Sequence, residues 1–220
     1  CGIEGISERL RRCLHKNLPD EVLGPGLKAI LKAPIRELKI FLIATGLEAE
    51  KDFEGLKDLV DFVAVNLRYS ARRPRIIFSV TPLVRFPWTP LEFADAFPAE
   101  HMKPILDRMK GMIRGRGFEF RQAAELDDNW LSQVLVRAAD PRIAAALLRA
   151  IEDTGFVHTR DVSPDFVKEF RRLLAEAGLS DKDLLSGASF EESAKKPWAG
   201  IGTGIRRQFL FEQYRRAAVF

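Results

Sequence analysis

The stretch Ile40-Phe-Leu-Ile-Ala-Thr-Gly-Leu-Glu-Ala-Glu-Lys-Asp52 decides the fold. Its unbroken apolar run ends at Gly46 and leads into an acidic segment with the composition of a helix. A run without polar alternation is typical of a strand buried on both faces of a parallel sheet, because crossover helices cover both sides. Loops at the carboxyl ends of such strands commonly build ligand sites. We therefore expect a parallel α/β sheet with a site just after this strand.

The neighbouring segments have the spacing of β-α-β units. The strand itself is expected over 37–45, a helix over 50–67 and a second strand over 75–80, which Pro74 precedes. Two strands separated by one helix are expected to be parallel, with a right-handed crossover. The same reasoning predicts the other elements of this half: the tail of a strand over 1–5, helices over 8–15, 20–33 and 99–115, and an edge strand over 118–122.

The alternation of expected strands and helices ends near residue 124. Four helices are expected beyond it, over 128–138, 142–154, 164–177 and 204–217, with no strand between them. Gly155 and Gly178 stand where two of these helices should end. The sequence thus predicts a parallel α/β part over 1–124 and an all-helical part over 125–220.

Composition narrows the class of protein. Of the 220 residues, 46% are hydrophobic and 30% are charged, and no apolar run approaches the roughly 20 residues of a membrane span. We therefore expect no membrane partner; no signal peptide is recognisable, and the use of two cysteines favours a reducing cytoplasm as the location. The net charge of +4 comes from basic residues scattered among nearly as many acids, so a nucleic-acid partner is possible but not favoured.

Cysteine usage and the first residues add two expectations. Cys1 and Cys13 are the two cysteines, too few for a disulfide framework or a metal site. The chain opens on Cys1-Gly-Ile-Glu-Gly5 without an initiator methionine, as if a strand were already in progress. We expect it to be a piece of a longer protein.

No catalytic set can be assembled from the residues alone. The histidines, His15, His101 and His158, are far apart in sequence and lack the spacing of metal ligands, so surface positions are favoured for them. No glycine-rich phosphate loop is present. Catalytic residues stay unassigned, and no metal ligand is expected.

Three polar residues follow expected strands, and each has two interpretations. Glu48 could accept hydrogen bonds from a ligand, or it could be a first-turn helix acid that the helix dipole favours. Ser7 could contact a ligand or cap the helix that follows it. Arg9 could contact a ligand or be a surface charge.

The segment Thr81-Pro-Leu-Val-Arg-Phe-Pro-Trp-Thr-Pro90 contains three prolines and two aromatic residues. Such a loop is stiff, and exposed rings suit a planar ligand such as a purine. The alternative is that the rings pack under the helical part. We expect contact with a ligand.

These motifs, taken in order, resemble the second half of a radical S-adenosylmethionine (radical SAM) barrel, in the uncharacterised bacterial branch that often carries a cobalamin-binding domain. Gly2-Ile-Glu-Gly-Ile-Ser-Glu-Arg-Leu-Arg11 is similar to the fourth-strand motif of that branch. Ile43-Ala-Thr-Gly-Leu-Glu-Ala-Glu-Lys-Asp52 resembles its fifth-strand segment I-G-L-P-G-E-T-x-x-D, with Ala44, Gly46 and Leu47 departing from it. Phe86-Pro-Trp-Thr-Pro-Leu-Glu-Phe93 resembles the sixth-strand loop K-P-x-T-P-x-Q-W.

The resemblance implies a fold, a cofactor and a site. The fold is the carboxyl-terminal half of a partial (β/α)6 barrel followed by a helical extension. The implied cofactor is S-adenosylmethionine, which a 4Fe-4S cluster cleaves to a deoxyadenosyl radical for hydrogen abstraction or for methyl or sulfur transfer. By the same resemblance its ribose and carboxylate would lie near Glu4, Ser7 and Arg9, and its adenine near the fifth- and sixth-strand loops, represented by Gly46, Glu48, Pro82, Phe86 and Pro87.

The family's Cys-x-x-x-Cys-x-x-Cys loop is absent from the sequence, and neither Cys1 nor Cys13 can replace it. The resemblance therefore implies that the cluster, and any cobalamin, are held by an amino-terminal half of the same polypeptide. This chain alone is expected to do no radical chemistry, and no substrate can be named. The alternative is a non-catalytic half-barrel that binds RNA or a protein partner.

Overall fold

The computed structural model describes all residues except 71, 139, 158–161, 188–189, 191–195 and 218–220. The chain divides into two compact units. Unit 1 contains Cys1–Leu83 and Glu100–Ala124, together with Ala217, and unit 2 contains Val84–Ala99 and Glu125–Arg216. Residues 84–99, which the sequence analysis places with the α/β part, thus group with the helices.

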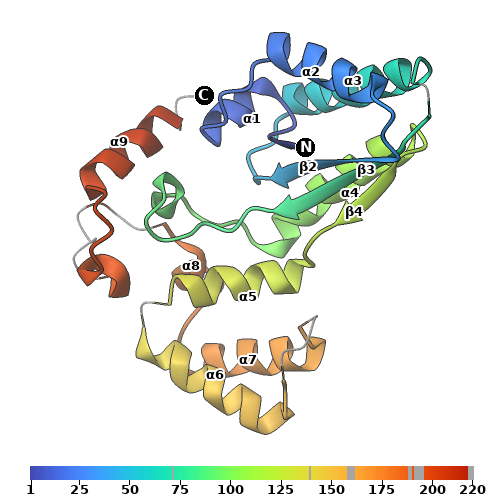
Figure 1. The fold of residues 1–220 in the computed structure, drawn as a ribbon. Coiled ribbons are helices and arrows are strands. Elements are labelled where there is room, and N and C mark those ends of the chain that lie inside the picture. Colours follow the sequence, from blue (N-terminus) through green and yellow to red (C-terminus); the bar gives the residue numbers. More distant parts are fainter. Residues whose placement is uncertain (71, 139, 158–161, 188–189, 191–195, 218–220) are drawn as a thin grey trace. The chain divides into compact units, whose positions relative to one another are not determined.

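Unit 1 is built on a sheet of four strands in the order β1-β2-β3-β4, and each neighbouring pair is parallel. The sheet confirms the expected parallel α/β fold, with helices between successive strands (Figure 1). The elements, in chain order, are β1 (Gly2–Glu4), α1 (Glu8–Cys13), α2 (Asp20–Lys32), β2 (Glu37–Ala44), α3 (Glu50–Leu67), β3 (Arg75–Pro82), α4 (Ala99–Arg114) and β4 (Glu119–Gln122).

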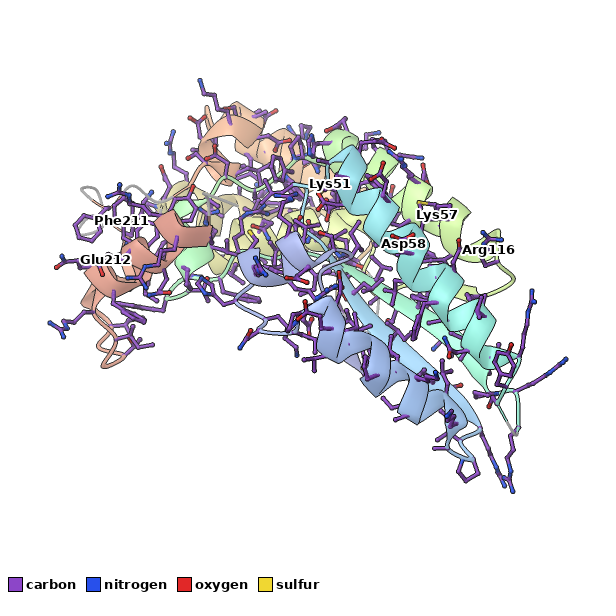
Figure 2. All side chains as sticks on the ribbon, turned by 90° about the horizontal axis from the view of Figure 1, so that it is seen from above. Lys51, Lys57, Asp58, Arg116, Phe211 and Glu212 are labelled. Carbon is purple, nitrogen blue, oxygen red and sulfur yellow. The ribbon has the colours of Figure 1, made fainter. Side chains whose placement is uncertain are left out.

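The helices of unit 1 form one layer. Viewed from above, α2, α3 and α4 lie side by side (Figure 2). α2 packs against α3, and an ion pair of 2.6 Å joins Asp61 of α3 to Arg116, just beyond the end of α4. When strands follow one another across a sheet in one direction, right-handed crossovers place all the helices on the same face. The order of the strands thus explains why one face of the sheet is covered.

The apolar run that begins at Ile40 was expected to be a strand buried on both faces. This expectation was wrong for β2, which contains the run. Its side chains alternate: those of Leu38, Ile40, Leu42 and Ala44 are buried, whereas Phe41 on the other face is 44% exposed. Continuous burial occurs instead in the neighbouring strand β3, from Ile76 to Val80. The apolar run was therefore a correct sign of a strand but not of two covered faces.

Unit 2 is helical. Its elements are a 3-10 turn, η1 (Pro90–Phe93), then α5 (Leu126–Val136), α6 (Pro141–Thr154), α7 (Pro164–Glu176), α8 (Asp181–Leu185), a second turn η3 (Pro197–Gly200), and α9 (Arg207–Ala217). The short helix α8 was not expected from the sequence. Gly155 and Gly178 adopt positive φ angles of 61° and 73°, as expected for residues that end helices.

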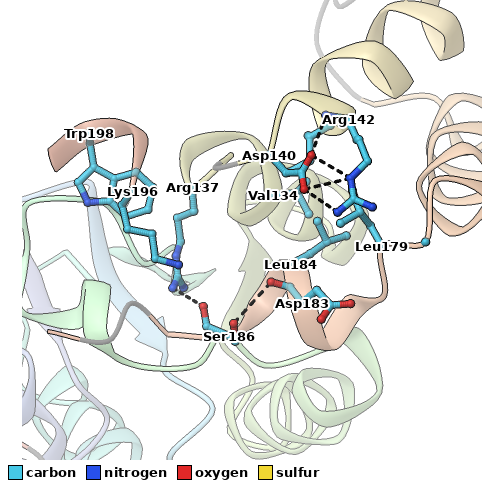
Figure 3. A pocket seen from close by; sticks show the side chains of 12 residues that line it. Val134, Arg137, Asp140, Arg142, Leu179, Asp183, Leu184, Ser186, Lys196 and Trp198 are labelled. Carbon is cyan, nitrogen blue, oxygen red and sulfur yellow. Dashed lines mark hydrogen bonds and ion pairs between the residues drawn. The ribbon is translucent and has the colours of Figure 1, made fainter. Parts of the chain in front are cut away.

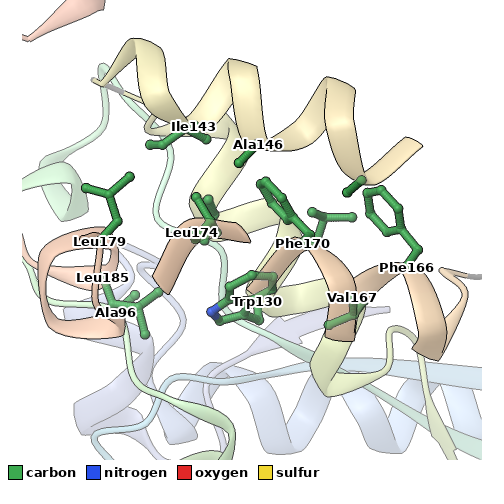
Figure 4. Close-up of a cluster of buried hydrophobic side chains, with 13 residues drawn as sticks. Ala96, Trp130, Ile143, Ala146, Phe166, Val167, Phe170, Leu174, Leu179 and Leu185 are labelled. Atoms are coloured by element: carbon green, nitrogen blue, oxygen red, sulfur yellow. The ribbon is translucent and has the colours of Figure 1, made fainter. Parts of the chain in front are cut away.

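The core of unit 2 lies between α5, α6 and α7 (Figure 4). Phe166 and Phe170 of α7 are almost fully buried; Phe170 packs edge-on against Trp130 of α5, and Phe166 stacks on Phe170. The indole Nε1 of Trp130 donates a hydrogen bond of 3.0 Å to Asp181 Oδ1, so its polar atom is satisfied inside the core. Among the described residues, none of the helices combines the length and apolar composition that a membrane span requires.

Candidate functional site

The loops after β1 and β2 meet at the carboxyl edge of the unit 1 sheet. The turn after β1 is tight, because a Cβ atom on Gly5 would lie 2.5 Å from the backbone nitrogen of Arg11. Only glycine lets α1 approach the end of β1 this closely. Ser7 caps α1, since its Oγ accepts a hydrogen bond of 3.2 Å from Leu10 N. The close approach brings Ser7 and Arg9 to the loop that follows β2.

Asp52, in the first turn of α3, joins the two loops. Its carboxylate is 2% exposed in the folded unit. Oδ1 accepts hydrogen bonds from Ser7 Oγ at 2.5 Å and Arg9 Nε at 3.1 Å, and Oδ2 accepts them from Arg9 Nη2 at 2.5 Å and Ala49 N at 2.8 Å. Arg9 Nη2 also donates to the carbonyl of Leu47 at 2.8 Å. Ser7 and Arg9 therefore hold the loop after β2 in place.

The carboxylate of Asp52 is kept ionised by these donors. Burial alone disfavours its charged form, but the hydrogen bonds from Arg9, Ser7 and the Ala49 backbone outweigh burial and lower the pKa of Asp52 below its usual value. The same pairing raises the pKa of Arg9. In the sequence, Asp52 stands out only as the last residue of the segment 43–52. Its role depends on Ser7 and Arg9, more than 40 residues away in the chain.

Glu48 turns back onto its own loop. Its Oε1 accepts hydrogen bonds from the backbone nitrogen of Thr45 at 2.6 Å and the Thr45 hydroxyl at 2.9 Å, and its Oε2 accepts one from Gly46 N at 2.8 Å. It lies before α3, which begins at Glu50, so the interpretation as a first-turn helix acid was wrong. Glu48 fixes the conformation of the loop, in which Gly46 has a φ of +84°.

The helix α4 contacts the same loop. His101 Nε2 lies 2.7 Å from the carbonyl oxygen of Gly46, and because a carbonyl can only accept, this ring nitrogen carries the proton. Arg108 forms an ion pair with Glu50, and its guanidinium lies 3.9 Å from the centre of the Phe53 ring. Sequence reasoning missed the contact of His101, since nothing local connects α4 to residue 46.

Two further candidates of unit 1 lie at strand ends. Glu4, the last residue of β1, has a φ of +71° and lies 3.7 Å from Lys16 Nζ. Pro82, the last residue of β3, is buried and is paired in register with Ala44 of β2. The structure thus places Glu4, Ser7, Gly46, Glu48 and Pro82 at the carboxyl ends of neighbouring strands or in the loops that follow them, and Arg9 in the first turn of α1.

The other two candidates, Phe86 and Pro87, belong to unit 2. The ring of Phe86 is exposed, and its carbonyl accepts a hydrogen bond of 2.7 Å from Thr89 Oγ1. Trp88 has a φ of +60°, a left-handed conformation that costs energy for a bulky residue. Its backbone nitrogen donates to Glu92 Oε2 at 2.6 Å, which holds this conformation.

Glu92 was not singled out from the sequence, although it is fully buried. Its Oε1 lies 2.6 Å from Arg207 Nη2 of α9. The guanidinium of Arg207 lies between 5.5 and 5.6 Å from the ring centres of Phe93 and Trp88. Phe93 also packs edge-on against Phe211, 5.1 Å away. Of the two rings in the proline-rich loop, that of Trp88 is partly buried beside Arg207 within unit 2, and that of Phe86 is exposed.

The loop after β2 offers an apolar side chain to a ligand, because Leu47 at its centre is 42% exposed. Among the described residues, no group of three or more histidine, cysteine, aspartate or glutamate side chains could hold a metal ion. His158 lies outside the described residues. Comparison of the chain with models of known protein families, with curated protein sequences and with solved structures finds no match.

Proposed function

We propose that unit 1 is the S-adenosylmethionine-binding edge of a radical SAM barrel, to which this chain contributes the later strands. One observation carries the proposal: four parallel strands lie side by side in chain order, with helices between them. In a barrel of alternating strands and helices, each strand lies beside the one that precedes it in the chain. A doubly wound sheet reverses its strand order instead, and places helices on both faces.

Within the described part of unit 1, one face of β2 is not covered by helices, as is expected for a strand of a barrel. Phe41, Lys39 and Ile43 project from the face opposite the helices, and all three are at least partly exposed. In a complete barrel this face is the interior, where side chains from all strands pack together. The remaining strands would come from the amino-terminal half that the resemblance implies.

In this proposal the site residues of unit 1 position the ligand loop. Arg9 and Ser7 fix Asp52, and Glu48 fixes the backbone of Thr45 and Gly46. The loop then presents the side chain of Leu47, which suits the apolar face of an adenine ring. Bound S-adenosylmethionine would supply the radical chemistry, and this chain would bind and orient it.

The described residues do not fit a 4Fe-4S cluster. Cys1 is exposed, Cys13 is buried in α1, and these are the two cysteines of the chain. A cluster of the family's type needs three thiolates close together. The proposal therefore assigns the cluster and any cobalamin to residues outside this chain, and no reaction step is assigned to the residues described.

Isothermal titration calorimetry of the 220-residue chain with S-adenosylmethionine tests the proposal. We expect Glu48→Gln to weaken binding by about tenfold, because an amide nitrogen cannot accept hydrogen bonds from both backbone groups. The control is Glu100→Gln on the exposed side of α4, which removes the same charge and should bind like the wild type. A folded chain that does not bind S-adenosylmethionine would contradict the proposal and favour a half-barrel that binds a macromolecule.

A further inference from the structure

A cavity of about 320 Å³ lies within unit 2 (Figure 3). Residues of α5, α6, α8 and η3 border it, together with the segments that connect them. Part of its wall is apolar, from Val134, Ile143, Leu179 and Leu184, and the buried ring of Trp198 adds an aromatic surface. The volume is at the lower end of the range for small-molecule sites.

In the wall of this cavity, the charges of Asp140 and Arg142 neutralise each other. Arg142 donates to both carboxylate oxygens of Asp140, and its Nη1 donates to the carbonyl of Ala177 at 2.7 Å. Asp183 Oδ2 accepts hydrogen bonds from the backbone and hydroxyl of Ser180. This side of the cavity is therefore satisfied without a ligand.

Arg137 is a different case, because its charge is buried and no carboxylate of the described residues contacts it. It is 7% exposed. Its guanidinium donates to the carbonyls of Ser186 at 2.5 Å, Glu92 at 3.3 Å and Ala94 at 3.4 Å. Burial lowers the pKa of Arg137, although Asp95 and Glu92 act against this from a distance. Glu92 is already paired with Arg207, and Asp95 accepts a hydrogen bond from Gly187.

Lys196 brings a second positive charge to the cavity. Its side chain is half-buried and forms no hydrogen bond or ion pair with any residue that the structure describes. In Figure 3 the amino group of Lys196 and the guanidinium of Arg137 are drawn on one side of the cavity, and Asp140, Arg142 and Asp183 on the other. One end of the cavity thus carries two cations that no carboxylate contacts among the described residues.

We propose that this cavity binds a small molecule that carries a compact anionic group, a carboxylate or a phosphate, on an apolar body. The anion is held by Lys196 and Arg137, and the body lies against Trp198 and the aliphatic wall. A guanidinium and an ammonium are the groups that bind such anions most strongly in proteins. The cavity lies wholly within unit 2, so this site does not depend on the function proposed for unit 1.

Titration calorimetry with phenyl phosphate, benzoate and inorganic phosphate tests the proposal on the whole chain. We expect phenyl phosphate or benzoate to bind with a dissociation constant of about 1 mM or tighter, and the stronger of the two identifies the preferred anion. Inorganic phosphate should bind at least about tenfold more weakly than phenyl phosphate, because it lacks the apolar body. Failure of both aromatic probes to bind would overturn the proposal.

Variants of one lysine locate the site. Lys196→Gln should weaken binding by about fivefold or more, and Lys196→Arg should retain it, since the charge is kept. The control is Lys168→Gln, which removes the same charge from the exposed surface of α7 and should leave the affinity unchanged. Equal weakening by Lys168→Gln and Lys196→Gln would show a general charge effect and overturn the assignment.

Discussion

The guanidinium of Arg9 binds the carboxylate of Asp52 through two nitrogen atoms, with Nη2 2.5 Å from Oδ2 and Nε 3.1 Å from Oδ1. This pair joins the segment after β1 to the start of α3, and so fixes two neighbouring loops at the carboxyl edge of the sheet. Asp52 is buried and Arg9 is only partly exposed, so water competes little for the carboxylate. A bidentate pair of this kind is stronger and more directional than most surface ion pairs.

Asp52→Asn should lower the free energy of unfolding by about 2 to 3 kcal/mol at pH 7. The amide removes the negative charge that Arg9 and Ser7 face, and one of its two ends is a donor where the carboxylate accepts. Urea unfolding followed by far-ultraviolet circular dichroism measures the loss. Glu54→Gln, an exposed change on the same helix, is the control and should alter the unfolding free energy by less than about 0.5 kcal/mol. Equal stability of Asp52→Asn and the wild type would show that the pair contributes nothing.

The stability contributed by Asp52 should depend on pH in a defined direction. Its pKa is lower in the folded chain than the value of about 3.9 expected when unfolded. Its contribution is therefore fully present above pH 5 or so and is lost as the pH falls through the lower, folded pKa. The difference in unfolding free energy between the wild type and Asp52→Asn should shrink between about pH 5 and pH 2. A difference that stays constant over this range would contradict the assignment of the shifted pKa.

Gly5→Ala should destabilise unit 1 by about 2 kcal/mol or more, because the added Cβ would lie 2.5 Å from Arg11 N and 2.6 Å from Leu10 C. The matched control is Gly26→Ala in α2, where a Cβ would meet nothing within 4 Å. That change should stabilise the chain by about 0.5 to 1 kcal/mol, since alanine favours a helix interior. Thermal unfolding of both variants gives the comparison, and shifts of the same sign would contradict it.

Arg207→Met should destabilise unit 2 by about 3 kcal/mol or more, because it leaves the fully buried Glu92 without its cation. The double variant Glu92→Leu with Arg207→Met removes both charges and should lose less stability than the single variant. All three tryptophans, Trp88, Trp130 and Trp198, belong to unit 2, so tryptophan fluorescence during urea unfolding reports on this unit. A double variant less stable than Arg207→Met would show that packing, and not the buried charge, dominates.

Local patterns predicted much of the fold. The helix over 50–67 has the bounds of α3, because its apolar residues repeat at helical spacing and acidic residues open it. The strand over 37–45 ends one residue earlier in the structure, at Ala44. Gly155 and Gly178 marked helix ends because residues there need positive φ angles. The short helix α8 was missed, since five residues are too few to show a helical repeat.

The sequence by itself determined which segments form strands and helices and in what order they follow along the chain, because apolar periodicity, prolines and glycines act over a few residues. Only the tertiary structure decided what the polar residues do: Arg9 with Asp52, His101 with the carbonyl of Gly46, and Glu92 with Arg207. Each of these contacts joins residues 43 or more positions apart in the chain. A buried charge pairs with the group that the fold places within hydrogen-bond distance, and that distance cannot be inferred from a local sequence pattern.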